Sequence, residues 1–147
     1  MKGERGYTLV ETLIAIAITG CIAAVTGLAV KQVVTVPEQG NAHVDALHAL
    51  QSAAHWVSLD GQAADSATGG GSLTLMLTDN STVTYTLSGS NLQRTGDNIT
   101  RTVAQYIAYV DFSVQGRTIT MNVTAAPGSR WSVSENQTYE IAMRPTG

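Results

Sequence analysis

A single carboxylate, Glu11, stands at the head of a long apolar run, and its type and position suggest chemistry more than any other residue here. Residues 12–30 carry no charged side chain. At a rise of about 1.5 Å per helical residue, this stretch would reach roughly 28 Å, close to the thickness of a bilayer's hydrocarbon core. An ionisable group at the edge of such a segment is costly in lipid. Glu11 is therefore expected to have a function beyond packing.

The residues before Glu11 form a recognisable order. Gly6 ends a short leader, MKGERG, and the apolar run opens with YTLVE at residues 7–11. This order closely resembles the N-termini of type IV prepilins and type II secretion pseudopilins: a short charged leader, Gly, an aromatic residue, Thr-Leu-hydrophobic-Glu and an apolar helix. The resemblance implies that a membrane-embedded prepilin peptidase cuts between Gly6 and Tyr7 and, as an N-methylase, methylates the new amine of Tyr7.

The same resemblance implies where the protein acts and with which partners. A single-pass precursor would lie in the bacterial cytoplasmic membrane, with the lipid bilayer around residues 7–36 and the C-terminal domain outside the cytoplasm. An inner-membrane assembly platform would then transfer it into a filament, where its helix packs against other pilin or pseudopilin subunits. Because a buried carboxylate and a buried amine are each costly when unpaired, Glu11 of one chain would lie beside the Tyr7 amine of its neighbour.

Two other interpretations compete for this segment. A secretory signal peptide has an apolar region of about 7–15 residues, whereas this run is longer and has an acid near its start. A plain signal anchor would keep the membrane span but has no use for Glu11. The prepilin interpretation therefore accounts for more of the residues.

Composition bounds what lies beyond the span. Of 147 residues, about a hundred remain for one small domain with a modest core. The net charge of −3 becomes one unit more negative when residues 1–6 are removed, which makes nucleic acid an unlikely partner. The single cysteine, Cys21, lies in the apolar run, so no intramolecular disulfide is expected and the domain depends on packing and strand pairing.

One long helix is predicted for residues 7–60. Residues 7–36 form its transmembrane and assembly half, and residues 37–60 its exported amphipathic half, where apolar positions recur every three to four residues. Pro37 removes a backbone donor and clashes with the preceding turn, which predicts a kink near this residue. The apolar face of the exported half is expected to contain Val44, Leu47, Leu50 or Gln51, Ala54, and Val57 or Ser58.

The amino-acid composition changes after the predicted helix. Residues 61–72, GQAADSATGGGS, are glycine-rich and polar, and they are expected to be a loop. In residues 73–147, short runs of Thr, Val and Tyr alternate with turn residues, which is typical of an antiparallel meander. Strands are predicted at residues 73–77, 83–87, 92–94, 99–103, 109–114, 118–124 and 138–143. The fold class is α+β: a long spine helix packed on one C-terminal antiparallel β-sheet, a pilin-like architecture with Trp56 as an anchor between helix and sheet.

The second half carries a more diffuse resemblance of its own. The segments YTLSGSNLQR, VDFSVQGRTITMNVTA and EIAMRP follow a helix that ends near Asp60, and this layout resembles J-type minor pseudopilins and their competence-pilus counterparts. It implies a minor structural subunit with a priming or tip role in a type IV pilus or type II secretion pseudopilus. The alternative is a DNA-uptake or adhesive minor pilin whose β-domain binds a ligand through its arginines. These are Arg94, Arg101, Arg117, Arg130 and Arg144.

No catalytic residue, metal site or cofactor is predicted. The three histidines of the exported helix do not complete a metal-ligand spacing and are expected to be solvated or packed. The turn-rich segments lack the density of oxygen ligands that calcium needs. Neither a nucleophile beside a base nor a phosphate-binding loop is evident, so the protein is not expected to be an enzyme. The residues considered are His43, His48, His55, Asp60, Asp65, Asp79 and Asp97.

Overall fold

One α-helix and eight β-strands form the protein in a computed structural model that describes residues 8–128 and 132–145. The chain divides into two compact units, residues 1–38 and residues 39–147, and the helix α1 (Leu9–Ala63) contributes to both. The predicted α+β fold class is confirmed. The strands are β1 (Ala64–Thr68), β2 (Ser72–Leu77), β3 (Thr82–Ser88), β4 (Asn91–Gly96), β5 (Ile99–Ala104), β6 (Ile107–Gln115), β7 (Thr118–Ala125) and β8 (Glu135–Ala142).

The described part of the first unit is helical and long enough to cross a membrane. Leu9–Val33 has 25 residues with a mean hydropathy of 2.4, and none of its apolar stretch is buried within the structure. Its hydroxyl groups are satisfied without water, because Thr19 Oγ1 donates to the Ala15 carbonyl and Thr26 Oγ1 to the Ile22 carbonyl, each at 2.8 Å. Such local bonds let threonine lie in an apolar helix at little cost.

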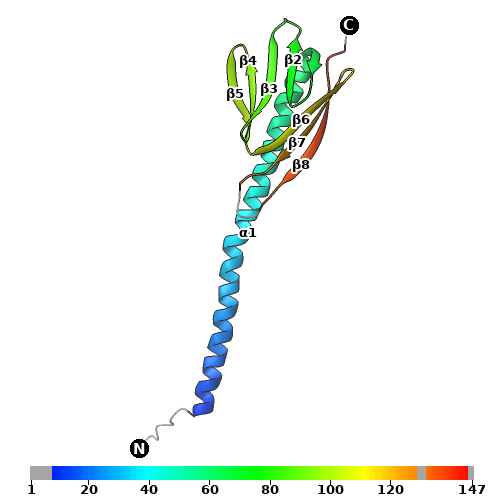
Figure 1. Cartoon of the computed structure of the whole chain (residues 1–147). Coiled ribbons are helices and arrows are strands. Elements are labelled where there is room, and N and C mark those ends of the chain that lie inside the picture. Colours follow the sequence, from blue (N-terminus) through cyan, green and yellow to red (C-terminus); the bar gives the residue numbers. More distant parts are fainter. Residues whose placement is uncertain (1–7, 129–131, 146–147) are drawn as a thin grey trace, which may run out of the picture. The chain divides into compact units, whose positions relative to one another are not determined.

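Two antiparallel sheets lie beside the second part of α1 (Figure 1), so the expectation of a single sheet is wrong. β1 to β5 form a five-stranded sheet in sequence order, and β6 to β8 form a three-stranded sheet. The ladder breaks at the turn between β5 and β6, where Tyr106 has a φ of 62° and the Ile107 N–H donates to the Ser90 carbonyl (2.9 Å). Gly70 and Phe112 then join the two sheets through reciprocal backbone bonds of 2.6 and 2.9 Å.

The core of the second unit lies where α1 meets the sheets, and the helix contributes mainly small side chains to it. The prediction for this face is correct at Leu50 and Val57 but wrong at Val44, which is 46 % exposed. The buried stripe is instead rich in alanine, because a small side chain lets large strand residues approach the helix backbone. The buried alanines of α1 are Ala42, Ala46, Ala49 and Ala53. The largest fully buried strand residues are Tyr85, Phe112, Leu73, Leu75, Leu92, Ile107, Ile119 and Met121.

The prediction of a loop at residues 61–72 is also wrong in part. Helix α1 continues to Ala63, and β1 (Ala64–Thr68) follows it at once and pairs with β2. Only Ala64 of this strand is fully buried, so its polar residues give no hydrophobic pattern that sequence reasoning could detect. The glycines at residues 69–71 then make the connection to β2.

Candidate functional site

The start of α1 has the form of a helix cap. Thr8 precedes the first helical residue, Leu9, and its Oγ1 accepts a hydrogen bond from the backbone N–H of Glu11 (3.3 Å). Glu11 is the third residue of the helix, which gives the Thr-x-x-Glu spacing of a capping box. A carboxylate in the first turn also lies at the positive end of the helix dipole. The local sequence thus fixes both the first residue of the helix and the place of Glu11 in it.

The Glu11 carboxylate is exposed among apolar side chains. Its neighbours Leu9, Val10 and Leu13 are 81, 65 and 63 % exposed. No ion pair to Glu11 exists within residues 8–128 and 132–145. In lipid or in a bundle of helices this carboxylate is stable only beside a donor or a cation. The helix start can therefore accept a positive group from outside the described chain.

The other predicted site residues are placed differently. Gly6 and Tyr7 lie outside the described residues, so cleavage after Gly6 and methylation of Tyr7 stay predictions. Pro37 lies within α1, which is assigned without a break across it. The proline does not end the helix, and the kink expected there stays a prediction.

A cluster of polar side chains is buried near the C-terminal end of α1. Asp60 is only 7 % exposed. Its Oδ2 accepts hydrogen bonds from the Tyr85 hydroxyl and from Arg94 Nε (2.6 Å), and its Oδ1 accepts one from Arg94 Nη2 (2.9 Å). β3 and β4 place Tyr85 and Arg94 directly opposite each other, and the guanidinium carbon lies 5.8 Å from the centre of the Trp56 ring. The cluster therefore fastens the helix end to the first sheet.

The pKa shifts of Tyr85 and Arg94 indicate that this cluster has a structural role. Burial, together with the hydrogen bond to Asp60, raises the pKa of Tyr85 well above its ordinary value. The hydrogen bonds to Asp60 likewise raise the pKa of Arg94. Tyr85 thus stays neutral and Arg94 charged at physiological pH, so neither is ready to exchange a proton. The sequence interpretation missed this cluster, since it considered Asp60 only as a metal ligand in a turn-rich segment and Arg94 only as part of a ligand-binding surface.

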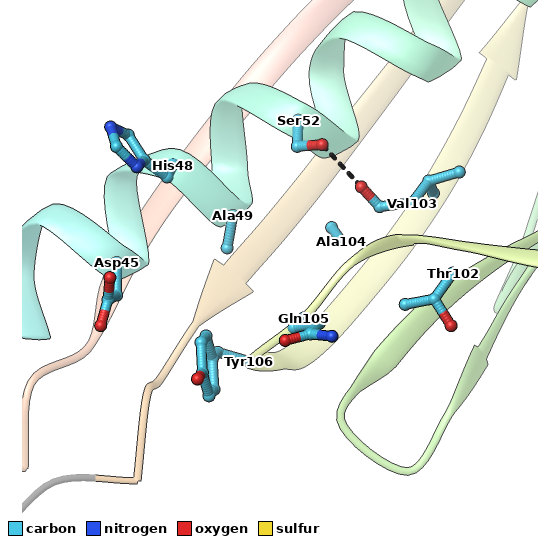
Figure 2. Close-up of a pocket in the computed structure, with 9 residues that line it drawn as sticks. All are labelled: Asp45, His48, Ala49, Ser52, Thr102, Val103, Ala104, Gln105 and Tyr106. Carbon is cyan, nitrogen blue, oxygen red and sulfur yellow. Dashed lines mark hydrogen bonds between the residues drawn. The ribbon is translucent and has the colours of Figure 1, made fainter.

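A groove lies between α1 and the turn that joins β5 to β6 (Figure 2). Its volume is about 340 Å³. At its back, Ser52 Oγ donates to the Val103 carbonyl (2.6 Å). Figure 2 shows the His48 ring pointing away from Asp45 and Tyr106, so the groove contains no acid–base pair in contact. Its lining residues are Asp45, His48, Ala49, Ser52, Thr102, Val103, Ala104, Gln105 and Tyr106.

The remaining His and Asp residues that were considered as metal ligands do not gather around one point in the described part of the chain. His43 Nδ1 lies 3.1 Å from Glu135 Oε1, which ties α1 to β8. Asp79 accepts hydrogen bonds from the backbone N–H and hydroxyl of Ser81, which lower its pKa. No group of three or more His, Cys, Asp or Glu side chains that could hold a metal ion occurs among the described residues.

The arginines do not form one open basic stripe. Arg94 is bound by Asp60, as described above. Arg117 donates through Nη1 to the Asp65 carbonyl (3.2 Å) and through Nη2 to the Arg144 carbonyl. Both guanidinium groups are thus used within the domain, while Arg130 lies outside the described residues.

Comparison with known proteins gives a match at the N-terminus. Residues 1–27 match a family model described as the prokaryotic N-terminal methylation motif. No curated protein and no solved structure matches the chain. The matched residues include the leader, the cap with Glu11 and the first part of the apolar helix. The match supports a type IV prepilin-like precursor, and such a motif implies processing by a prepilin peptidase and assembly with other pilins.

Proposed function

We propose that this protein is a structural subunit of a type IV pilus or type II secretion pseudopilus, cut between Gly6 and Tyr7, methylated on the Tyr7 amine and assembled through α1. The observation that carries the proposal is the match to the methylation motif at the start of α1, whose apolar segment Leu9–Val33 has 25 residues. The large side chains of this segment are exposed on all sides. They need lipid before assembly and neighbouring helices after it.

Glu11 would determine how far neighbouring helices are shifted along each other. Cleavage after Gly6 creates an amine on Tyr7, and methylation keeps its positive charge. A neighbouring Glu11 carboxylate would accept a hydrogen bond from this amine, which removes two unpaired charges from the helix bundle. Since burying both charges costs nearly as much as their attraction returns, the pair fixes register more than it adds stability.

Within such a filament we assign the chain a minor role, as a subunit that primes assembly or stands at the tip. The support is the resemblance of residues 45–145 to J-type minor pseudopilins. The alternative role, a β-domain that binds DNA through an arginine stripe, is less favoured because Arg94 and Arg117 are bonded within the domain.

The test compares matched substitutions in the full chain, expressed with its peptidase and sibling subunits. Gly6→Val should abolish cleavage, whereas Gly3→Val, the same change inside the leader, should be cut at the normal rate; mass spectrometry of the new N-terminus reads the result. Glu11→Ala should be cut normally but be largely lost from the sheared filament fraction, while Glu11→Asp keeps the charge and retains part of the incorporation. Normal cutting of Gly6→Val, or normal incorporation of Glu11→Ala, would refute the proposal.

A further inference from the structure

The β-domain has two outer strand edges. The two sheets meet at β1 and β6, through the pairing of Gly70 with Phe112, and this leaves β5 and β8 at the far ends of their sheets. In the described part of the chain, neither outer edge pairs with another strand. Proteins commonly protect such edges with Pro or with charged side chains; β5 and β8 have no Pro, and their charges are Arg101 on β5 and Glu135 and Glu140 on β8. Such an edge repels a strand of like charge and is suited to accept one whose charges are opposite.

β8 runs in the same direction as α1. Its first residue, Glu135, lies at His43 (3.1 Å). Near its end, Glu140 lines a groove together with Ser58 and Gln62, which lie 15 and 19 residues after His43 on α1. The strand therefore follows the helix from His43 toward its C-terminus.

β5 runs in the opposite direction. Arg101 lies directly opposite Arg94, whose guanidinium group binds Asp60 near the end of α1. Two residues later, the Val103 carbonyl accepts a hydrogen bond from Ser52, which lies earlier on the helix. In two copies with parallel spine helices, β5 of one is therefore antiparallel to β8 of the other. Arg101 and Glu140 also lie at the same level, beside the last turns of α1.

β5 and β8 carry opposite charges, Arg101 and Glu140, and neither side chain forms an ion pair among the described residues. Arg101 is exposed and has no ion-pair partner among the described residues, although it stands opposite a second arginine, Arg94. Like charges directly opposite each other destabilise a sheet, so an external carboxylate beside Arg101 is favoured. On the β8 side, Glu140 is exposed and likewise has no ion pair in the described residues.

Apolar surface accompanies both edges. Ile99, the first residue of β5, is 51 % exposed. A groove of about 460 Å³ runs between α1 and β8, and its lining includes Leu59, which is 55 % exposed, and Tyr139. An isoleucine on an incoming strand could therefore be covered beside β8.

We propose that the β5 edge of one copy of this chain pairs antiparallel with the β8 edge of a second copy, with Arg101 beside Glu140. Ile99 then lies beside Ala142, at the groove that α1 forms with the end of β8. The pairing is head-to-tail, so two or more copies can stand side by side where the chain primes assembly or forms the tip. A two-fold dimer is disfavoured, because it would place Glu140 beside Glu140 or Arg101 beside Arg101. The proposal rests on the proposed function in one respect, the parallel alignment of the spine helices.

The test is site-specific cross-linking of the full chain in membranes. In a Cys21→Ala background, one tagged chain carries Arg101→Cys and a second, differently tagged chain carries Glu140→Cys. A short bismaleimide should link the mixed pair at least about fivefold more than either variant with itself. Thr78→Cys, exposed in the turn between β2 and β3, is the control partner and should not be linked to Glu140→Cys.

A charge reversal checks the same contact without cysteines. Arg101→Glu or Glu140→Arg alone should lower the co-purification of two tagged copies, and the two changes together in every copy should restore it. Stronger links between identical positions, links only to a different subunit, or absent links in a chain that is processed and incorporated would each overturn the pairing and leave the proposed function standing. Mixed links in a chain that is never cut after Gly6 would support the pairing and refute the proposed function.

Discussion

Replacing Asp60 by Ala should strongly destabilise the β-domain. The carboxylate is 7 % exposed and accepts hydrogen bonds from both Tyr85 and Arg94. Its loss leaves a buried hydroxyl and a largely buried guanidinium group without an acceptor. Removing one partner of a buried ion pair costs about 3–5 kcal/mol. Because 22 % of the Arg94 side chain is exposed and water can solvate part of it, the lower end, about 3 kcal/mol, applies here.

A loss of this size is easily measured. For a domain of about 100 residues, 1 kcal/mol shifts the Tm by at least about 4 °C, so Asp60→Ala should lower it by about 12 °C or more. The full chain in detergent can be heated while near-UV circular dichroism or Trp fluorescence is followed, since both tryptophans, Trp56 and Trp131, lie outside the apolar segment Leu9–Val33. Asp65→Ala, an exposed aspartate on β1, is the matched control and should leave the Tm nearly unchanged.

A double variant separates an orphaned charge from a general loss of packing. Asp60→Ala with Arg94→Met removes both charges, so it should be more stable than Asp60→Ala alone. The reasoning is refuted if Asp60→Ala behaves like Asp65→Ala, or if the double variant is at least as unstable as the sum of its two single changes.

Two further predictions concern pH and the glycine connection. Because burial raises the pKa of Tyr85 in the folded protein, the unfolded chain loses the phenol proton first, above its ordinary pKa of 10.0, and stability falls as the pH rises further. One such group contributes about 1.4 kcal/mol per pH unit, so Tyr85→Phe should flatten the Tm–pH curve above about pH 10; an unchanged slope contradicts this. Gly69→Ala should lower the Tm, because a Cβ there would clash with the Phe112 carbonyl, whereas Gly71→Ala has open space and should be neutral. Equal effects of the two substitutions would show that the Gly70–Phe112 connection tolerates a shift.

The elements that a sequence predicts well here are those set by local chemistry. The long helix follows from its apolar run, and β2 to β7 follow from alternating residues between turns such as Asp97-Asn98, where both residues have positive φ. The single-sheet expectation is wrong because the break depends on Tyr106, whose positive φ is rare for a bulky residue and has no sequence signature. β1 could not be predicted because its side chains are mostly exposed.

The buried cluster of Asp60, Tyr85 and Arg94 could not be predicted from the sequence for a different reason. Asp60 meets Tyr85 and Arg94 at sequence separations of 25 and 34 residues, so the contact exists only after the helix has docked on the sheet. The Glu11 site is the opposite case. Its place near the start of the helix and its apolar surroundings arise within a few neighbouring residues, which is why the sequence predicts them, although the helix begins at Leu9 with Thr8 as its cap and not at residue 7.

Glu11 and Asp60, the acids near the two ends of α1, both need a positively charged or hydrogen-bonding partner, but they differ in where that partner can come from. A carboxylate that leaves water needs a cation or hydrogen-bond donors. Asp60 has both from β3 and β4 of its own chain, so this carboxylate needs no other molecule. Glu11 has neither within the described residues, although its helix is too apolar to remain exposed to water. Asp60 is therefore satisfied within the described chain, whereas Glu11 needs a partner from outside the described residues, which is what the proposed assembly through α1 would supply.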